Sequence, residues 1–235
     1  MEDREVKRAR DAQNFFFLLA SIFMASLVAC NLIFQKFFFW APFKALGIDY
    51  TFEISVGLIP YPITFLVTDL ISELYGQRKA NQVVMAGLVA SLFLLAIVMI
   101  ANAVPATSWS PVDDATFSKV FGLTGVAVFA SMMAYLFAQF IDIKLFHFWK
   151  RRTKGKKRWL RNNLSTIPSQ FIDTAMVLGL LCYFGVIPWE NFGFLFLNGF
   201  IFKVIVALLD TPLFYLATNW GRRHFALAHD EEMDD

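Results

Sequence analysis

Residues 82–104 read QVVMAGLVASLFLLAIVMIANAV, a run without a single charged side chain. A helix needs about 20 mainly apolar residues to cross the roughly 30 Å of hydrocarbon in a bilayer, so this run is long enough to span a membrane. The composition agrees, because 57% of the 235 residues are hydrophobic and only 17% are charged. A soluble domain of this size has too little interior to bury so much apolar surface. We therefore expect a membrane protein.

Further apolar segments lie on both sides of this run, and together they predict an all-α membrane protein, a bundle of six transmembrane helices. Gly57, Pro60 and Pro62 interrupt the start of the second span, and residues 43–57 ahead of it alternate weakly in hydropathy. This pattern predicts a short extracellular hairpin or a re-entrant segment between the first two helices. The spans are expected near residues 15–35, 58–76, 82–104, 120–143, 164–187 and 194–219.

Lysine and arginine are distributed unevenly among the connections. Four precede the first span, two lie in the second connection, nine in the fourth and two after the last span, against only three on the opposite side. Because positive flanks are retained on the cytoplasmic side, both termini are expected in the cytoplasm. The chain then divides into a cytoplasmic segment (1–14), a six-span transmembrane domain (15–220) and a cytoplasmic tail (221–235).

Ionisable side chains fall within the apolar spans, where each charge costs roughly 2.5–3.5 kcal/mol at mid-bilayer. They are therefore expected to face the interior of the bundle. Residues three or four apart share one face of a helix, which groups these polar side chains in pairs. The pairs are Asp69 with Glu73, Gln139 with Asp142, and Gln170 with Asp173, while Lys203 and Asp210 lie two turns apart on a further helix.

These groups predict a polar cavity rather than a set of hydrogen bonds that only join neighbouring helices. Four aspartates face a single lysine, Lys203, so three acids still need protons, water or a ligand after one ion pair has formed. Taken singly, Asn31, Asn198 and Gln139 are better explained as interhelical hydrogen bonds. The candidate substrate-binding residues are Asp69, Glu73, Gln139, Asp142, Gln170, Asp173 and Lys203.

Three other patterns have simple interpretations. Ser21, Ala25 and Ala29 place small residues at every fourth position and predict a helix-packing face. The basic stretch 150–161 is interpreted as a cytoplasmic loop beside anionic lipid head groups, not as a nucleic-acid patch. The acidic tail 230–235 is predicted to be disordered.

Catalytic and cofactor motifs are absent from the sequence. It contains no H-E-x-x-H zinc motif, no G-x-S-x-G nucleophile turn and no phosphate-binding loop. Cys30 and Cys182 lie inside apolar runs and cannot frame a zinc site. We therefore expect neither an enzyme nor a cofactor, and any uphill movement of a solute must be driven by an ion gradient or by another protein.

Five blocks of sequence, taken together and in this order, resemble the queuosine-precursor transporter family, also called the vitamin uptake transporter family. The resemblance covers roughly residues 15–220 and implies a multi-pass transporter of the cell inner membrane. Its substrate would be a 7-deazaguanine base, imported for salvage into transfer RNA modification, with membrane lipid as its surroundings and no nucleic acid as a partner. The blocks are TDLISELYG (68–76), AYLFAQFID (134–142), WLRNNLST (159–166), SQFIDT (169–174) and FKV (202–204).

The implied substrate is chemically compatible with the candidate residues. A 7-deazaguanine presents a ring N–H beside an exocyclic amine, which a carboxylate can accept in two parallel hydrogen bonds. Asp173 or Asp69 is the expected acceptor, with Gln170, Gln139 and Lys203 as supporting donors.

The mode of transport stays open at this stage. Transport by this chain alone, ion-coupled or facilitated, is one hypothesis. The alternative is a substrate-capture subunit of a multi-protein ATP-driven vitamin uptake system, which requires an energising partner. A homo-oligomer is compatible with either, whereas a channel or a purely structural membrane protein would bind no base.

Overall fold

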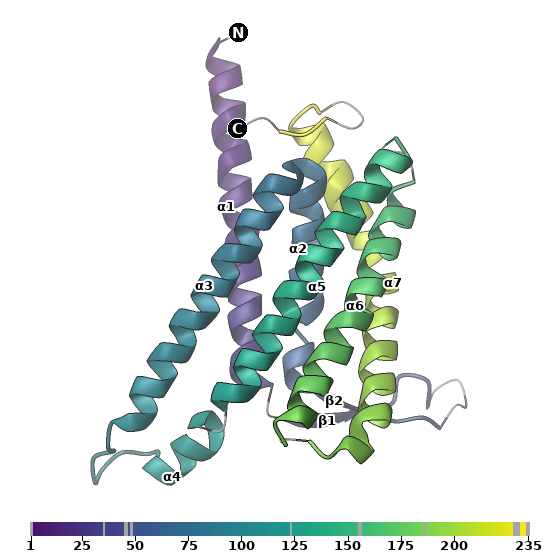
Figure 1. Cartoon of the computed structure of the whole chain (residues 1–235). Helices are drawn as coiled ribbons and strands as arrows, with labels where there is room; N and C mark the ends of the chain where they lie inside the picture. The colour runs from purple at the N-terminus through teal and green to yellow at the C-terminus, as the bar shows by residue number, and fades with distance from the viewer. Residues whose placement is uncertain are drawn as a thin grey trace.

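The computed structural model of the chain describes residues 2–34, 36–44, 47, 49–122, 124–154, 157–185, 187–227 and 231–233. Within them it contains six candidate membrane spans, each built on a helix, which confirms the expected fold class (Figure 1). The long helices are α1 (Glu2–Ile33), α2 (Tyr61–Leu74), α3 (Gly76–Ala103), α5 (Thr124–Arg152), α6 (Arg158–Tyr183) and α7 (Phe192–His224). The short elements are strands β1 (Phe37–Trp40) and β2 (Phe52–Ser55), helix α4 (Asp114–Phe117) and the single turns η2 (Val56–Leu58), η3 (Ser118–Gly122) and η4 (Trp189–Asn191).

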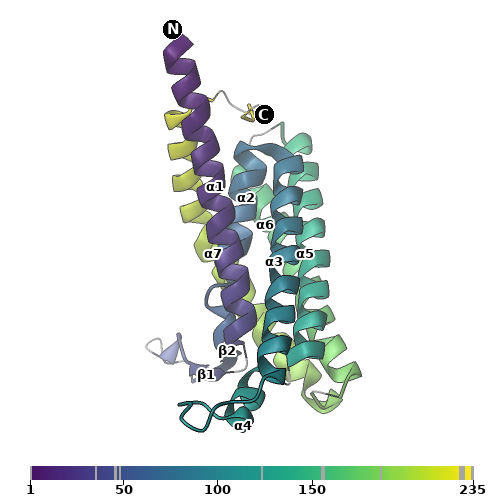
Figure 2. The same cartoon turned by 90° about the vertical axis from the view of Figure 1, so that its left-hand side faces the viewer.

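The bundle has two distinct ends. Both chain termini, the α2–α3 turn and the α5–α6 connection lie at one end, here called the termini end (Figure 1). The two strands, α4 and the α6–α7 connection lie at the other, here called the hairpin end. The first turns of α1 extend past the other helices at the termini end (Figure 2).

A hairpin is present between the first two helices, but only its second strand lies within the predicted segment 43–57. Strands β1 and β2 pair antiparallel, with Phe37 opposite Ser55 and Trp40 opposite Phe52. Alternate residues of β2, Phe52 and Ile54, are only 2% exposed and belong to an apolar cluster with Phe202 of α7. The hairpin therefore packs onto the helices through one face.

Helix α2 is too short to cross a bilayer alone. Its 14 residues span about 21 Å at 1.5 Å per residue, against roughly 30 Å of hydrocarbon. The single turn η2, directly before α2, completes the candidate span Val56–Leu74. Non-helical backbone at this depth is tolerated only where protein covers it, and α1 covers it here.

Gly57 makes this coverage possible. A Cβ atom at this position would lie 2.8 Å from the carbonyl oxygen of Cys30 and 2.9 Å from Cα of Phe34, both backbone atoms at the end of α1. Gly179, on α6, has open space around the same position.

Gly57→Ala is therefore expected to lower the free energy of unfolding by about 1–3 kcal/mol, the range for overpacking in a tight contact. Gly179→Ala is the matched control and should be neutral or mildly stabilising, because alanine favours a helix over glycine. Thermal unfolding of the two purified variants in detergent compares them. Equal stability of the two would contradict the close approach of α1 to η2.

Two expectations about helix surfaces are corrected. Ser21 and Ala25 are exposed, so the small-residue stripe does not pack against other helices of this chain. The buried face of α1 carries larger side chains, and a Cβ atom on Gly87 of α3 would lie 2.6 Å from the ring of Phe23. The bulk of this face is provided by Leu19, Phe23, Leu27 and Cys30.

The basic stretch 150–161 was expected as a loop, but much of it is helical. Helix α5 continues to Arg152, and α6 begins at Arg158, six residues before the predicted span 164–187. The physical reason is that Lys150 and Arg161 are only 7% and 0% exposed and are bound by acidic partners. Residues 155–156 lie outside the described part of the chain.

Candidate functional site

A cavity of about 190 Å³ lies towards the hairpin end, between the hairpin, α1, the start of α2, α5, α6 and α7. Since one water takes about 30 Å³ of liquid, this volume suits a small solute rather than a single water. The walls are mainly apolar, with a few polar groups that converge on it. Such a lining is typical of small-molecule sites. Its polar members include Asn31, Glu53, Tyr61, Tyr135, Asp173 and Lys203.

Asp173 of α6 and Lys203 of α7 form a buried ion pair in the wall of this cavity. The Lys203 Nζ atom donates to Oδ2 of Asp173 at 2.5 Å and lies 4.4 Å from the centre of the Tyr61 ring. An ammonium over an aromatic face gains a favourable cation–π interaction. Oδ1 of Asp173 has no hydrogen-bond partner in the described structure, although the residue is only 2% exposed. Asp173, in the wall of the cavity, therefore keeps one carboxylate oxygen with unused hydrogen-bonding capacity.

A second, much smaller cavity of about 20 Å³ lies on the other side of this ion pair. Its lining includes Thr166, Gln170 and Asp210, and it shares Tyr61 and Lys203 with the larger cavity. A volume of this size holds about one water. Tyr61 and Lys203 thus form the partition between the two spaces.

Asp69 of α2 and Asp142 of α5 meet in the protein interior, and α6 supplies hydroxyl donors to both. Thr166 donates to Oδ2 of Asp69 at 3.4 Å, and Ser169, one turn further along α6, donates to Oδ1 of Asp142 at 3.0 Å. The two carboxyl groups lie close enough together to share a hydrogen bond. Because an ionised carboxylate only accepts, such a bond needs a proton on one of the two groups.

Gln139 of α5 lies between α2 and the larger cavity. Its Oε1 accepts from the hydroxyl of Thr68 at 3.2 Å, and its Nε2 donates to the Tyr135 hydroxyl at 2.5 Å. The other two amides join elements as well. Asn31 donates to Ser91 at 3.4 Å, linking α1 to α3, and Asn198 accepts from the Tyr50 hydroxyl.

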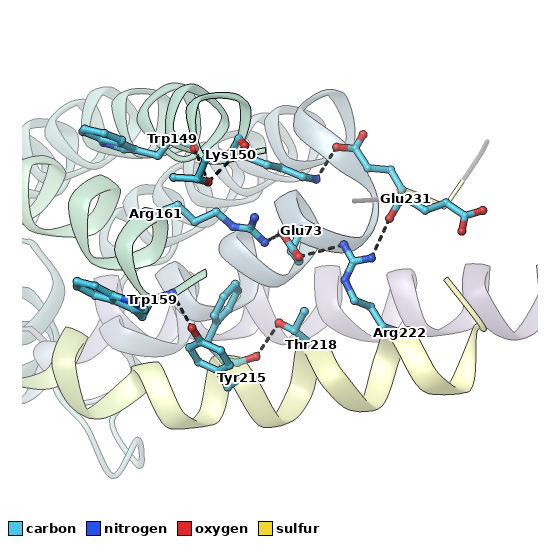
Figure 3. A network of polar contacts seen from close by, with 12 residues as sticks. Glu73, Trp149, Lys150, Trp159, Arg161, Tyr215, Thr218, Arg222 and Glu231 are labelled. Carbon is cyan, nitrogen blue, oxygen red and sulfur yellow. Dashed lines mark hydrogen bonds and ion pairs between the residues drawn. The ribbon is translucent and has the colours of Figure 1, made fainter. Parts of the chain in front are cut away.

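Glu73 is held at the termini end by two arginines (Figure 3). Its Oε2 accepts from Nη2 of Arg161 on α6, and its Oε1 accepts from Nη2 of Arg222 on α7 at 3.0 Å. The Glu73 side chain is 1% exposed, so all three charges lie away from water. This charge cluster fastens α2, α6 and α7 together.

The described part of the C-terminal tail, residues 231–233, packs against this cluster, so these residues are not disordered as predicted. Lys150 donates to Oε1 of Glu232 at 2.7 Å, the backbone N–H of Met233 donates to the Leu74 carbonyl at 2.7 Å, and Arg222 donates to the Glu231 carbonyl at 3.3 Å. Residues 230, 234 and 235 lie outside the described residues.

The seven predicted site residues therefore fall in separate places along the bundle. Asp173 and Lys203 line the larger cavity and Gln170 the smaller one. The pair of Asp69 and Asp142 lies nearby. Gln139 connects this part of the interior to Tyr135 through a hydrogen bond. Glu73 lies apart, in the charge cluster at the termini end.

Sequence reasoning missed several polar partners of these residues. Arg161 was assigned to a solvated basic loop, and nothing local indicates that its partner lies 88 positions away. Tyr61, Thr166 and Ser169 were missed as well, although Thr166 and Ser169 carried one available signal. The two hydroxyls occupy the helix face of Gln170 and Asp173, with spacings of three and four residues.

Six apolar helices, five of which line a solute-sized cavity with a buried charge pair, define a multi-pass membrane protein. The particular family follows from comparison with known sequences. Residues 55–217 match the family described as "Putative vitamin uptake transporter". Because this match spans more than half of the chain, the protein belongs to that family, which confirms the resemblance seen in the five sequence blocks.

Two relatives carry the name "Probable queuosine precursor transporter". The one from Bacillus subtilis (strain 168) is 26% identical over 164 residues, which cover 69% of this chain and 71% of the relative. The one from Haemophilus influenzae (strain ATCC 51907 / DSM 11121 / KW20 / Rd) is 22% identical over 198 residues, 80% of each chain. No solved structure matches this chain significantly.

Proposed function

We propose that this protein imports a 7-deazaguanine precursor of queuosine across the inner membrane, and that the 190 Å³ cavity is its binding site. The observation that carries the proposal is the buried carboxylate of Asp173, which keeps one oxygen without a donor in a cavity of solute size. The names of the two relatives support the substrate class.

The chemistry of the cavity suits this base. Asp173 would accept the ring N–H and the exocyclic amine in two parallel hydrogen bonds, and Lys203 would donate to the ring carbonyl. The rings of Tyr61 and Tyr135 supply aromatic faces for a flat heterocycle. Gln170 lies on the far side of the partition, where it would meet the base during passage.

Access would alternate between the two ends of the bundle. In this structure the cavity lies towards the hairpin end, whereas Glu73, Arg161 and Arg222 fasten three helices at the termini end. The excess of lysine and arginine in the connections at the termini end supports a cytoplasmic location for that end and for both termini. The structure then corresponds to a state closed towards the cytoplasm.

Binding of a panel of deazapurines and purines to the purified protein tests the substrate class. Saturable binding of deazaguanines alone supports the proposal, while saturation by an unrelated class of solute, or by none, contradicts it. Co-purification with ATPase subunits would favour the capture-subunit alternative.

Asp173→Asn tests the site itself in cells that depend on an external precursor. Asparagine presents an N–H₂ group in place of one acceptor oxygen, so one of the two hydrogen bonds to the base is lost and the other loses its charge. Charge-assisted hydrogen bonds contribute about 1.5–3 kcal/mol each, so uptake should fall at least about tenfold. Asp49→Asn, an exposed aspartate in the connection between β1 and β2, is the control and should retain parental uptake. Parental uptake by a normally inserted Asp173→Asn variant would exclude this cavity as the binding site.

A further inference from the structure

The carboxyl pair of Asp69 and Asp142 lines neither cavity, and among the described residues neither acid forms an ion pair. Asp69 is 2% exposed and Asp142 is fully buried. In the described part of the chain, the ion pairs of Arg161, Arg222 and Lys203 go to other acids. Two adjacent buried carboxylates cannot both be ionised without a large cost in desolvation and repulsion. Something positive must therefore sit between them.

The buried carboxyl oxygens that lack a hydrogen-bond donor show where this positive charge would lie. Oδ1 of Asp69 and Oδ2 of Asp142 are buried without any donor, although hydroxyls from α6 satisfy the opposite oxygen of each group. A proton shared by the two carboxyls satisfies both groups at once and reduces the pair to a single negative charge.

We propose that Asp69 and Asp142 together form the binding site for a coupling proton that crosses the membrane with the base. This inference rests on the proposed transport function and adds its energy source. The proton enters from the side where protons are abundant and is held between the two carboxyls. It leaves on the other side when movement of the helices separates or hydrates the pair.

The geometry favours a proton over a metal cation. A metal ion needs several oxygen ligands arranged around it, each about 2 Å or more away. Within the residues that the structure describes, no third Asp, Glu, His or Cys side chain joins the pair in a group that could hold a metal ion, and neither residue lines the 190 Å³ or the 20 Å³ cavity.

Helix α6 connects this site to the substrate cavity. Thr166 donates to Asp69 and also lines the small cavity, which Lys203 closes on its other side. Lys203 is bound in turn to Asp173, seven residues after Thr166 on the same helix. A second link runs from Thr68, beside Asp69, through Gln139 to Tyr135 in the cavity wall. Loss of the proton and departure of the base would therefore act on the same helix.

The buried charges that face the pair come from four helices. Arg161 on α6 acts on Asp69 directly, and Glu73 on α2 neutralises that arginine. Among the residues whose burial is described, α1 and α3 bury no charged side chain. Among the residues whose burial is described, the remaining buried or half-buried acidic and basic side chains on the packed helices are Asp11 on α1, Lys79 on α3, His147 and Lys150 on α5, Asp173 on α6, and Lys203, Asp210 and Arg222 on α7.

Purified protein in proteoliposomes tests the proposal with tritiated 7-deazaguanine as the probe. Two processes are measured at zero membrane potential. The first is accumulation of the base driven by an imposed pH gradient, acid outside. The second is counterflow, the exchange of labelled for unlabelled base, which needs no net movement of protons. The wild-type protein should show both.

Asp142→Asn is the main variant, because asparagine has the shape of the protonated acid but cannot release a proton. It should lose at least tenfold in accumulation driven by the pH gradient and keep counterflow within about twofold of the wild type. Asp69→Asn is the second variant and should show the same loss of accumulation and the same retained counterflow. Asp49→Asn is the matched control and should retain both processes, because the residue is exposed and distant from the pair.

Several results would overturn the proposal. They are continued accumulation by both variants in response to the pH gradient, loss of counterflow together with accumulation, and accumulation driven by a sodium gradient without a pH gradient. If neither variant folds, the proposal is tested by the number of protons that wild-type protein takes up when it binds the base in weak buffer. Uptake of about one proton per bound base supports the pair, and none contradicts it. Absence of base binding in the wild type would instead refute the proposed substrate.

Discussion

Replacing Glu73 by glutamine is expected to lower the free energy of unfolding by about 3–5 kcal/mol. The Glu73 carboxylate is the shared partner of Arg161 and Arg222, and their side chains are 0% and 7% exposed. Glutamine keeps the shape but removes the charge, which leaves two buried guanidinium groups beside a neutral amide. Breaking a buried ion pair by removing one partner carries a cost in this range, because the remaining charge stays desolvated.

Thermal unfolding in detergent measures this loss, expected as a fall of roughly 6–20 °C at 2–4 °C per kcal/mol. Glu232→Gln is the matched control, because it makes the same chemical change in a neighbouring pair whose acid is 42% exposed. Lys150 is buried, but the Glu232 end of the pair is open to water, which can reach the ammonium group when the charge of Glu232 is removed. The loss should therefore be about 1 kcal/mol or less, and this control should unfold within a few degrees of the parent. A fall of equal size in both variants would show that burial does not decide the effect.

A double variant separates charge from shape at this position. Arg222→Gln added to Glu73→Gln removes one of the two stranded charges and should recover part of the lost stability, although Arg161 remains. If the double variant is less stable than Glu73→Gln alone, the arginine stabilises the fold through packing rather than through its charge.

The contrast between Glu73 and the spans shows what sequence could and could not predict. Span 82–104 was identified because hydropathy is a local property, and α3 (Gly76–Ala103) contains nearly all of it. The hairpin was found from glycine, proline and alternation in one short segment. Both signals lie within a few residues of the structure that they specify.

Pairings between distant segments carry no such signal. Arg161 looks like one more member of a basic connection, and only the folded chain brings it to Glu73. Spacing along single helices predicted which acids share a helix face. Which acids meet, however, depends on how the faces of different helices pack against one another. Asp142 thus meets Asp69 of α2, whereas Asp173 meets Lys203 of α7. Spacing along one helix could place side chains on a face, but it could not choose the helix opposite.

Lys203→Met tests the second buried charge and is expected to affect stability and uptake together. Methionine matches the length of the lysine stem but leaves Asp173 buried without its ammonium partner. The single variant should lose about 3–5 kcal/mol of stability for the same reason as Glu73→Gln. Its uptake of a 7-deazaguanine should fall by about 100-fold, because a stranded carboxylate that gains a proton no longer accepts two hydrogen bonds. Lys44→Met, at an exposed lysine between β1 and β2, is the control and should be neutral for both.

The double variant Lys203→Met with Asp173→Asn distinguishes a structural ion pair from a binding group. Removing both charges leaves no buried ion without a partner, so thermal stability should return to within about 1 kcal/mol of the parent. Uptake should stay as low as in the single variant, because the acceptor for the base is gone. Recovered uptake would show that the pair only supports the fold. If stability does not recover, the loss in the single variant comes from packing around the lysine stem and not from the unpaired charge of Asp173.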